Sequence, residues 1–101
     1  MTGNDRDIAV AITTTEIDLT TAEAFDTELE AAVVTAQERE ATRLTLDFGA
    51  VHFLDSGGIS QLIDARNRLG EVGCRLEVSH VQRPVERVFD VLGLKTSFAV
   101  V

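Results

Sequence analysis

The sequence predicts an α/β fold in which strands and helices alternate along a single domain, residues 1–101. Large and small apolar residues alternate at 8–12, and apolar and polar residues alternate at 43–48 and 76–78, which is typical of strands; the apolar run 98–101 is interpreted as a last strand. Between them, apolar residues recur every three or four positions at 20–39, 59–69 and 84–92, which indicates amphipathic helices. Strands that alternate with helices pair in parallel through right-handed crossovers, so we expect a mostly parallel (mixed) sheet.

Residues at the helix ends support these boundaries. Thr20, followed three residues later by Glu23, predicts a capping box that opens the first helix. Gly70 and Gly73 are expected to stop the second helix, and Pro84 suits the first turn of the third. Because the strands alternate in polarity, we expect one sheet face to be less well covered than in a doubly wound fold.

The composition excludes several classes of function. Nine Lys and Arg against seventeen Asp and Glu give a net charge of −8, which argues against binding to nucleic acid or an anionic membrane. No segment approaches the length of a membrane span, and the N-terminal residues do not resemble a signal peptide. With one cysteine, Cys74, no internal disulfide forms. We therefore expect a cytoplasmic domain without membrane insertion.

The segment Asp55–Gly58 joins the end of a strand to the start of a helix, where functional loops of α/β sheets are found. Ser56 is expected at or near the helix N-cap, where free N–H groups and the helix dipole favour an anion. A phosphate on Ser56 would add about −1.5 to −2 charges there. Taken alone, these four residues are explained more simply by plain helix capping and a tight turn.

Catalytic motifs fit this segment poorly. A hydrolase nucleophile elbow needs glycine two positions before and after the serine, but Leu54 and Gly58 stand there. A phosphate-binding loop needs a lysine, and none is near. His52 is badly placed as a base, because it belongs to the same extended segment. We therefore expect no enzyme activity, no metal site and no cofactor.

Asp18 is the other polar residue of interest. It is predicted to end the first strand, just before the first helix. Because the ends of neighbouring strands meet at one edge of a sheet, we expect Asp18 near Asp55 and Ser56. The alternative is a loop aspartate that only helps to cap the helix.

The chain resembles the STAS domain and, within it, the bacterial anti-sigma factor antagonists. The resemblance depends on five stretches and their order, namely 16–22, 44–48, 51–59, 83–89 and 92–94 with Phe98. It implies a domain that binds an anti-sigma factor, a serine kinase, to release a sigma factor. It also implies that phosphorylation of Ser56 switches this binding off and that a phosphatase resets it. The implied partner-binding residues are Asp18, Asp55, Ser56, Gly57, Gly58 and Ile59.

The chain departs from the family pattern in three respects. Thr15 stands where the family has glycine, the leading strand of the family is expected to be short or absent, and the usual C-terminal helix after the last strand is expected to be missing. These departures leave open whether the domain acts alone, as a homodimer or within a larger assembly. Two alternative functions remain. One is a non-phosphorylated STAS scaffold subunit of a stress-sensing or transporter complex. The other is a small-ligand module, which the missing phosphate-binding lysine argues against.

Overall fold

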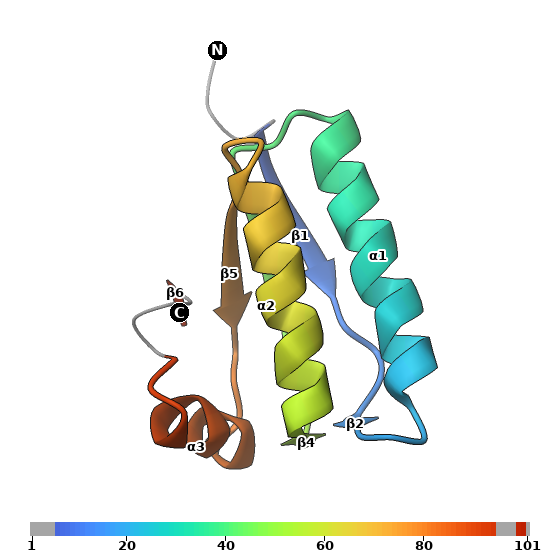
Figure 1. The fold of residues 1–101 in the computed structure, drawn as a ribbon, viewed down its shortest axis with the longest axis vertical. Helices are drawn as coiled ribbons and strands as arrows, with labels where there is room; N and C mark the ends of the chain where they lie inside the picture. The colour runs from blue at the N-terminus through green and yellow to red at the C-terminus, as the bar shows by residue number, and fades with distance from the viewer. Residues whose placement is uncertain (1–5, 95–98, 101) are drawn as a thin grey trace.

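The structure, a computed structural model, describes residues 6–94 and 99–100 and confirms the α/β class (Figure 1). Strands and helices follow one another with two short strands added to the predicted order. The elements are β1 (Asp7–Ala11), β2 (Glu16–Ile17), α1 (Ala22–Glu38), β3 (Arg43–Asp47), β4 (Phe53–Leu54), α2 (Ser56–Gly70), β5 (Arg75–Ser79), α3 (Arg83–Val91) and β6 (Ala99–Val100).

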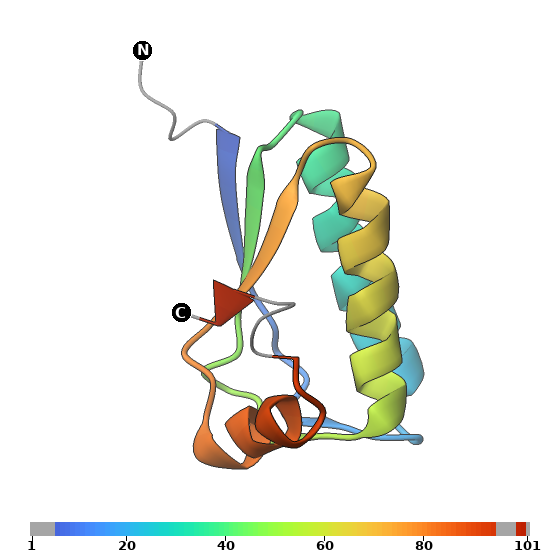
Figure 2. The same cartoon turned by 60° about the vertical axis from the view of Figure 1, so that its left-hand side comes forward.

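The main sheet has the strand order β1-β3-β5-β6, and every described pair in it is parallel. Helices α1 and α2 lie side by side on one face of this sheet, and α3 lies beyond the carboxyl ends of the strands (Figure 2). Among the described elements no helix covers the opposite face, which confirms the expected open face. Of the last predicted strand, β6 covers Ala99–Val100, whereas Phe98 and Val101 lie outside the described residues.

The core fills the space between the main sheet and the two helices. The inward residues of the strands are apolar, as their alternation predicted, and Leu44 and Leu46 of β3 are fully buried. Phe25 of α1 meets Phe48 edge to face, with ring centroids 6.4 Å apart. Cys74 is buried beside β5, and burial raises the pKa of its thiol. It is therefore a core residue.

The predicted capping box at the start of α1 is wrong. Thr21 occupies the N-cap and makes no capping hydrogen bond with its side chain. Thr20 lies one residue before this N-cap, and its hydroxyl donates to the carboxylate of Asp18. The predicted end of the second helix is confirmed, because Gly70 is the last residue of α2 and Gly73 follows it with a positive φ of 76°. Gly93 follows α3 in the same way, with a φ of 67°.

A two-stranded parallel sheet, β2 with β4, is the feature that the sequence pattern did not reveal. The first strand was predicted to continue to Asp18, but β1 ends at Ala11. The chain then leaves the main sheet because Glu28 of α1 binds it. Its carboxylate accepts hydrogen bonds from the backbone N–H and hydroxyl groups of both Thr13 and Thr14. This clamp directs the chain into β2.

Candidate functional site

The candidate site is built on the β2–β4 ladder. Ile17 pairs with Leu54, and the backbone N–H of Asp55 donates to the carbonyl of Ile17 at 3.0 Å. Asp18 and Asp55 each follow one of these paired residues. Because the two strands are parallel, both aspartates lie at the carboxyl end of the ladder. The structure thus brings together the chain segments at Asp18 and Asp55, as the sequence predicted, although through a separate small sheet.

Asp55 closes the start of α2. It occupies the N-cap with extended backbone, and its Oδ1 accepts a hydrogen bond from the N–H of Gly58 at 2.9 Å. This bond satisfies one of the free N–H groups of the first helical turn. Asp55 therefore caps the helix. The hydroxyl of the next residue, Ser56, is not needed for capping.

Ser56 is the first residue of α2 and is exposed. Within residues 6–94 and 99–100, its side chain makes no hydrogen bond. An exposed hydroxyl without an intramolecular role is accessible to a modifying enzyme. This observation removes the simpler explanation that Ser56 is present to cap the helix.

The carboxylate of Asp18 organises the turn before α1. It accepts hydrogen bonds from the Thr20 hydroxyl at 2.7 Å and from the Thr20 and Thr21 N–H groups at 2.9 and 3.2 Å. The Thr20 hydroxyl, together with these N–H groups, lowers the pKa of Asp18. Asp18 is thus held in place as an anion, and its turn presents Leu19, which is 88% exposed.

The next three residues differ in accessibility. Gly57 is exposed, but Gly58 and Ile59 are buried. A Cβ on Gly58 would lie 2.4 Å from Leu54 Cδ1 and 2.7 Å from Ile17 Cγ2, so the helix start packs directly on the ladder. Two of the six implied partner-binding residues, Gly58 and Ile59, are therefore buried in this structure. The first turn of α2 directs them inward, where they support the loop.

An apolar groove next to Ser56 was missed by the sequence analysis. It has a volume of about 340 Å³ and lies between the start of α2 and helix α3. Its lining consists of Leu54, Ser56, Arg87, Val88, Val91 and Leu92. One signal could have indicated it, because Val91 and Leu92 extend the apolar face of α3 beyond what its packing requires. They are 83% and 51% exposed.

Exposed apolar side chains gather at this end of the molecule. The structure describes six exposed large hydrophobic residues, and four of them belong to β4, to the turn after β2 or to the end of α3. These elements all lie at the lower end in Figure 1. The four residues are Leu19, Phe53, Val91 and Leu92. Such clustering is typical of a protein interaction site.

The two histidines have structural contacts in the loops nearby. His52 Nδ1 lies 3.1 Å from Oε1 of Gln82, whose Nε2 donates to the carbonyl of Gly49 at 2.6 Å. His80 Nδ1 lies 3.3 Å from a carboxylate oxygen of Asp47. These contacts join the loops that follow β3 and β5. Across the described part of the chain, no group of three or more His, Cys, Asp or Glu residues is arranged to hold a metal ion.

A comparison with known protein families identifies the family of this chain. The family model described as "Mlab, STAS domain" matches residues 3–101. The chain belongs to the STAS family. A comparison with curated protein sequences found no match.

A solved structure supports the fold of this STAS domain. The chain is similar to the anti-sigma factor antagonist SpoIIAA in its unphosphorylated form, with a TM-score of 0.53 and 18% sequence identity. The similarity covers 83% of this chain and 69% of SpoIIAA. At this identity, the likeness establishes a shared fold. No helix within the described ranges is long and apolar enough to cross a membrane.

Proposed function

We propose that this STAS domain is an anti-sigma factor antagonist. In its unphosphorylated form it binds an anti-sigma factor, an ATP-dependent serine kinase of the bacterial cytoplasm, which then releases its sigma factor. The observation that carries the proposal is the exposed hydroxyl of Ser56 beside an apolar groove. The groove and the exposed apolar side chains supply a docking surface, and the hydroxyl supplies a position for the switch.

Phosphorylation by the bound partner ends the interaction. The kinase transfers the γ-phosphoryl group of ATP to Oγ of Ser56, the hydroxyl proton is lost, and ADP is released. The new group carries about −1.5 to −2 charges in place of a neutral hydroxyl. It lies at the end of the ladder that also carries Asp18 and Asp55. Docking would then require desolvation of a phosphate, so the partner dissociates until a phosphatase removes the group.

Variants of Ser56 test this proposal. Ser56→Ala removes the acceptor oxygen and adds no negative charge to the groove, so it is expected to bind the partner kinase constitutively in ATP. Ser56→Asp places a negative charge at the groove and is expected to weaken binding at least tenfold. Isothermal titration against candidate anti-sigma kinases measures both effects, and mass spectrometry after incubation with ATP locates the phosphate.

The control is Ser60→Asp, which adds the same charge to an exposed serine one turn further along α2. Ser60 faces the space between α1 and α2 instead of the groove at α3. It is expected to bind like the wild type. If Ser56→Ala, Ser56→Asp and Ser60→Asp all bind the partner equally, the proposed switch does not exist.

A second candidate is a STAS scaffold subunit without a phosphorylation cycle. The matching family model is described as "Mlab, STAS domain", and this description does not name an anti-sigma factor antagonist. A scaffold would bury the same exposed apolar side chains permanently. Size-exclusion chromatography of cell lysate distinguishes the two, because a scaffold elutes in one large complex whose size is the same for Ser56→Ala and Ser56→Asp.

A further inference from the structure

Arg87 of α3 lines the same groove as Ser56. Its charge interactions differ from those of three other arginines in the structure. Arg43, Arg68 and Arg75 each make an ion pair. Arg87 is exposed, and within the described ranges its guanidinium makes no hydrogen bond or ion pair. The groove therefore has a cation without a partner at one position and an acceptor hydroxyl at another.

We infer that phosphorylated Ser56 captures Arg87, so that the guanidinium covers the apolar groove and closes it. This inference rests on the proposed phosphorylation of Ser56 and adds the residue that responds to it. A phosphate monoester is a preferred partner of arginine, because two N–H groups of the guanidinium fork match two phosphate oxygens.

The position of Arg87 determines what the ion pair would cover. Both residues lie on the lining of one groove whose remaining lining residues, Leu54, Val88, Val91 and Leu92, are apolar. A guanidinium held at the phosphate would therefore lie over these side chains. Phosphorylation thus removes the apolar docking surface in addition to adding charge.

The first experiment measures the ion pair in the isolated chain. Phosphoserine is incorporated at position 56 during translation, so that no kinase is needed, and the phosphate is titrated by ³¹P NMR. Loss of a partly exposed ion pair in Arg87→Gln is expected to raise the midpoint of the titration by about half a pH unit. Arg83→Gln is the control, because Arg83 lies one turn earlier on the same helix and does not line the groove.

The outcomes separate capture of the phosphate from a general effect of charge. Capture predicts a raised midpoint for Arg87→Gln and an unchanged midpoint for Arg83→Gln. An unchanged midpoint for Arg87→Gln overturns the inference. Equal shifts in both variants also overturn it, because they would show only a long-range effect of positive charge.

The second experiment measures closure of the groove. In wild type, phosphorylation is expected to shift the methyl NMR signals of Val88, Val91 and Leu92, whereas Arg87→Gln is expected to reduce these shifts by at least half. Equal shifts in the two proteins would overturn the closure. Failure of either NMR test leaves the binding of Ser56→Ala and Ser56→Asp to a kinase unaffected, so the inference and the proposed function fail separately.

Discussion

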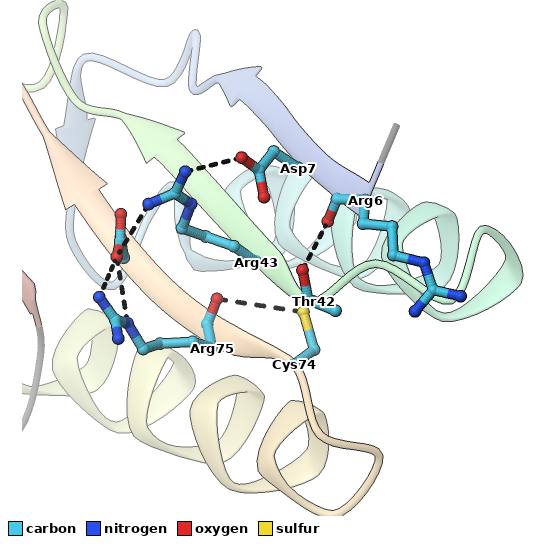
Figure 3. Close-up of polar contacts among 7 residues, drawn as sticks. Arg6, Asp7, Thr42, Arg43, Cys74 and Arg75 are labelled. Carbon is cyan, nitrogen blue, oxygen red and sulfur yellow. Dashed lines mark hydrogen bonds and ion pairs between the residues drawn. The ribbon is translucent and has the colours of Figure 1, made fainter. Parts of the chain in front are cut away.

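Two polar regions of this molecule are held in different ways. The β2–β4 ladder and the start of α2 are fixed by close packing of Gly58 on Ile17 and Leu54, and by hydrogen bonds within the chain. The open face of the main sheet is instead held by ion pairs between neighbouring strands. Figure 3 shows Arg43 of β3 paired with Asp7 of β1, and Arg75 lying along β5.

On the open face, two arginines lie near the same carboxylate, that of Glu77. Glu77 has a side chain only 5% exposed, and its Oε2 lies 2.8 Å from Arg75 and 3.8 Å from Arg43. The arginine side chains themselves are 69% and 45% exposed. Asp7 and then Glu77 raise the pKa of Arg43. Water and salt reach the two exposed guanidinium groups and weaken their pairing with the buried Glu77, whereas steric packing is insensitive to salt. The difference indicates that the geometry around Ser56 depends on shape more than on charge.

Gly58→Ala tests the close packing of α2 on the β2–β4 ladder. Of the variants compared in these two regions, it has the largest expected effect on stability. The new methyl group would meet Leu54 and Ile17 at 2.4 and 2.7 Å, so the start of α2 must move away from the ladder. We expect a loss of about 1–3 kcal/mol in the free energy of unfolding, measured by urea denaturation.

Gly57→Ala is the matched control. Its Cβ would lie 3.3 Å from Oδ1 of Asp55 and meets no core residue. The higher helix propensity of alanine offsets this contact, so the change in stability is expected within about 0.5 kcal/mol of zero. If Gly58→Ala were as stable as Gly57→Ala, close packing would not determine the geometry of the loop.

The apolar part of this arrangement could be predicted from the sequence. Alternation in β1, β3 and β5 and helical spacing in α1 to α3 correctly gave the buried faces, because burial imposes those periods. The strands β2 and β4 are two residues long, too short to show a period of two. The burial of Gly58 and Ile59 was therefore missed, since it depends on how α2 sits on that ladder.

Glu28→Gln tests the clamp that directs the chain into β2. We expect its effect on stability to be of intermediate size. The carboxylate accepts from Thr13 and Thr14, and the neutral amide replaces charged hydrogen bonds with weaker ones. We expect a loss of about 1–2 kcal/mol at pH 7, measured by urea denaturation. Glu38→Gln, an exposed residue at the end of α1, is the control and is expected to be neutral.

The pH dependence of this effect has a defined sign. Burial raises the pKa of Glu28, but the hydrogen bonds from Thr13 and Thr14 outweigh it, so the net pKa lies below its ordinary value of 4.5. A lowered folded-state pKa means that the clamp stabilises fully above about pH 4.5 and is lost as the pH falls through the folded value. The difference between wild type and Glu28→Gln should therefore shrink in acid. A difference that grew in acid would contradict the clamp.

The polar part of the site was less predictable than the apolar part. The spacing of Thr20 and Glu23 suggested a capping box, but α1 has Thr21 at its N-cap, and the hydroxyl of Thr20 donates to Asp18 in the turn before the helix. Local motifs of this kind compete for the same donors, and only the folded geometry decides between them. Arg87 was missed for a related reason, because nothing in the sequence shows that α3 reaches the start of α2.

Arg75→Gln tests the open face and has the smallest expected effect. It removes one ion pair from Glu77 but leaves Arg43 near the same carboxylate. Because Arg75 is largely exposed, we expect a loss of about 0.5 kcal/mol or less in dilute buffer. At about 1 M NaCl the Debye length falls to about 3 Å and the exposed guanidinium is screened, so the difference from wild type should shrink. The loss caused by Gly58→Ala should be the same at both salt concentrations, because a steric clash is not screened. A loss for Arg75→Gln that was large and independent of salt would mean that the open face is held by packing as well, and the contrast between the two regions would be wrong.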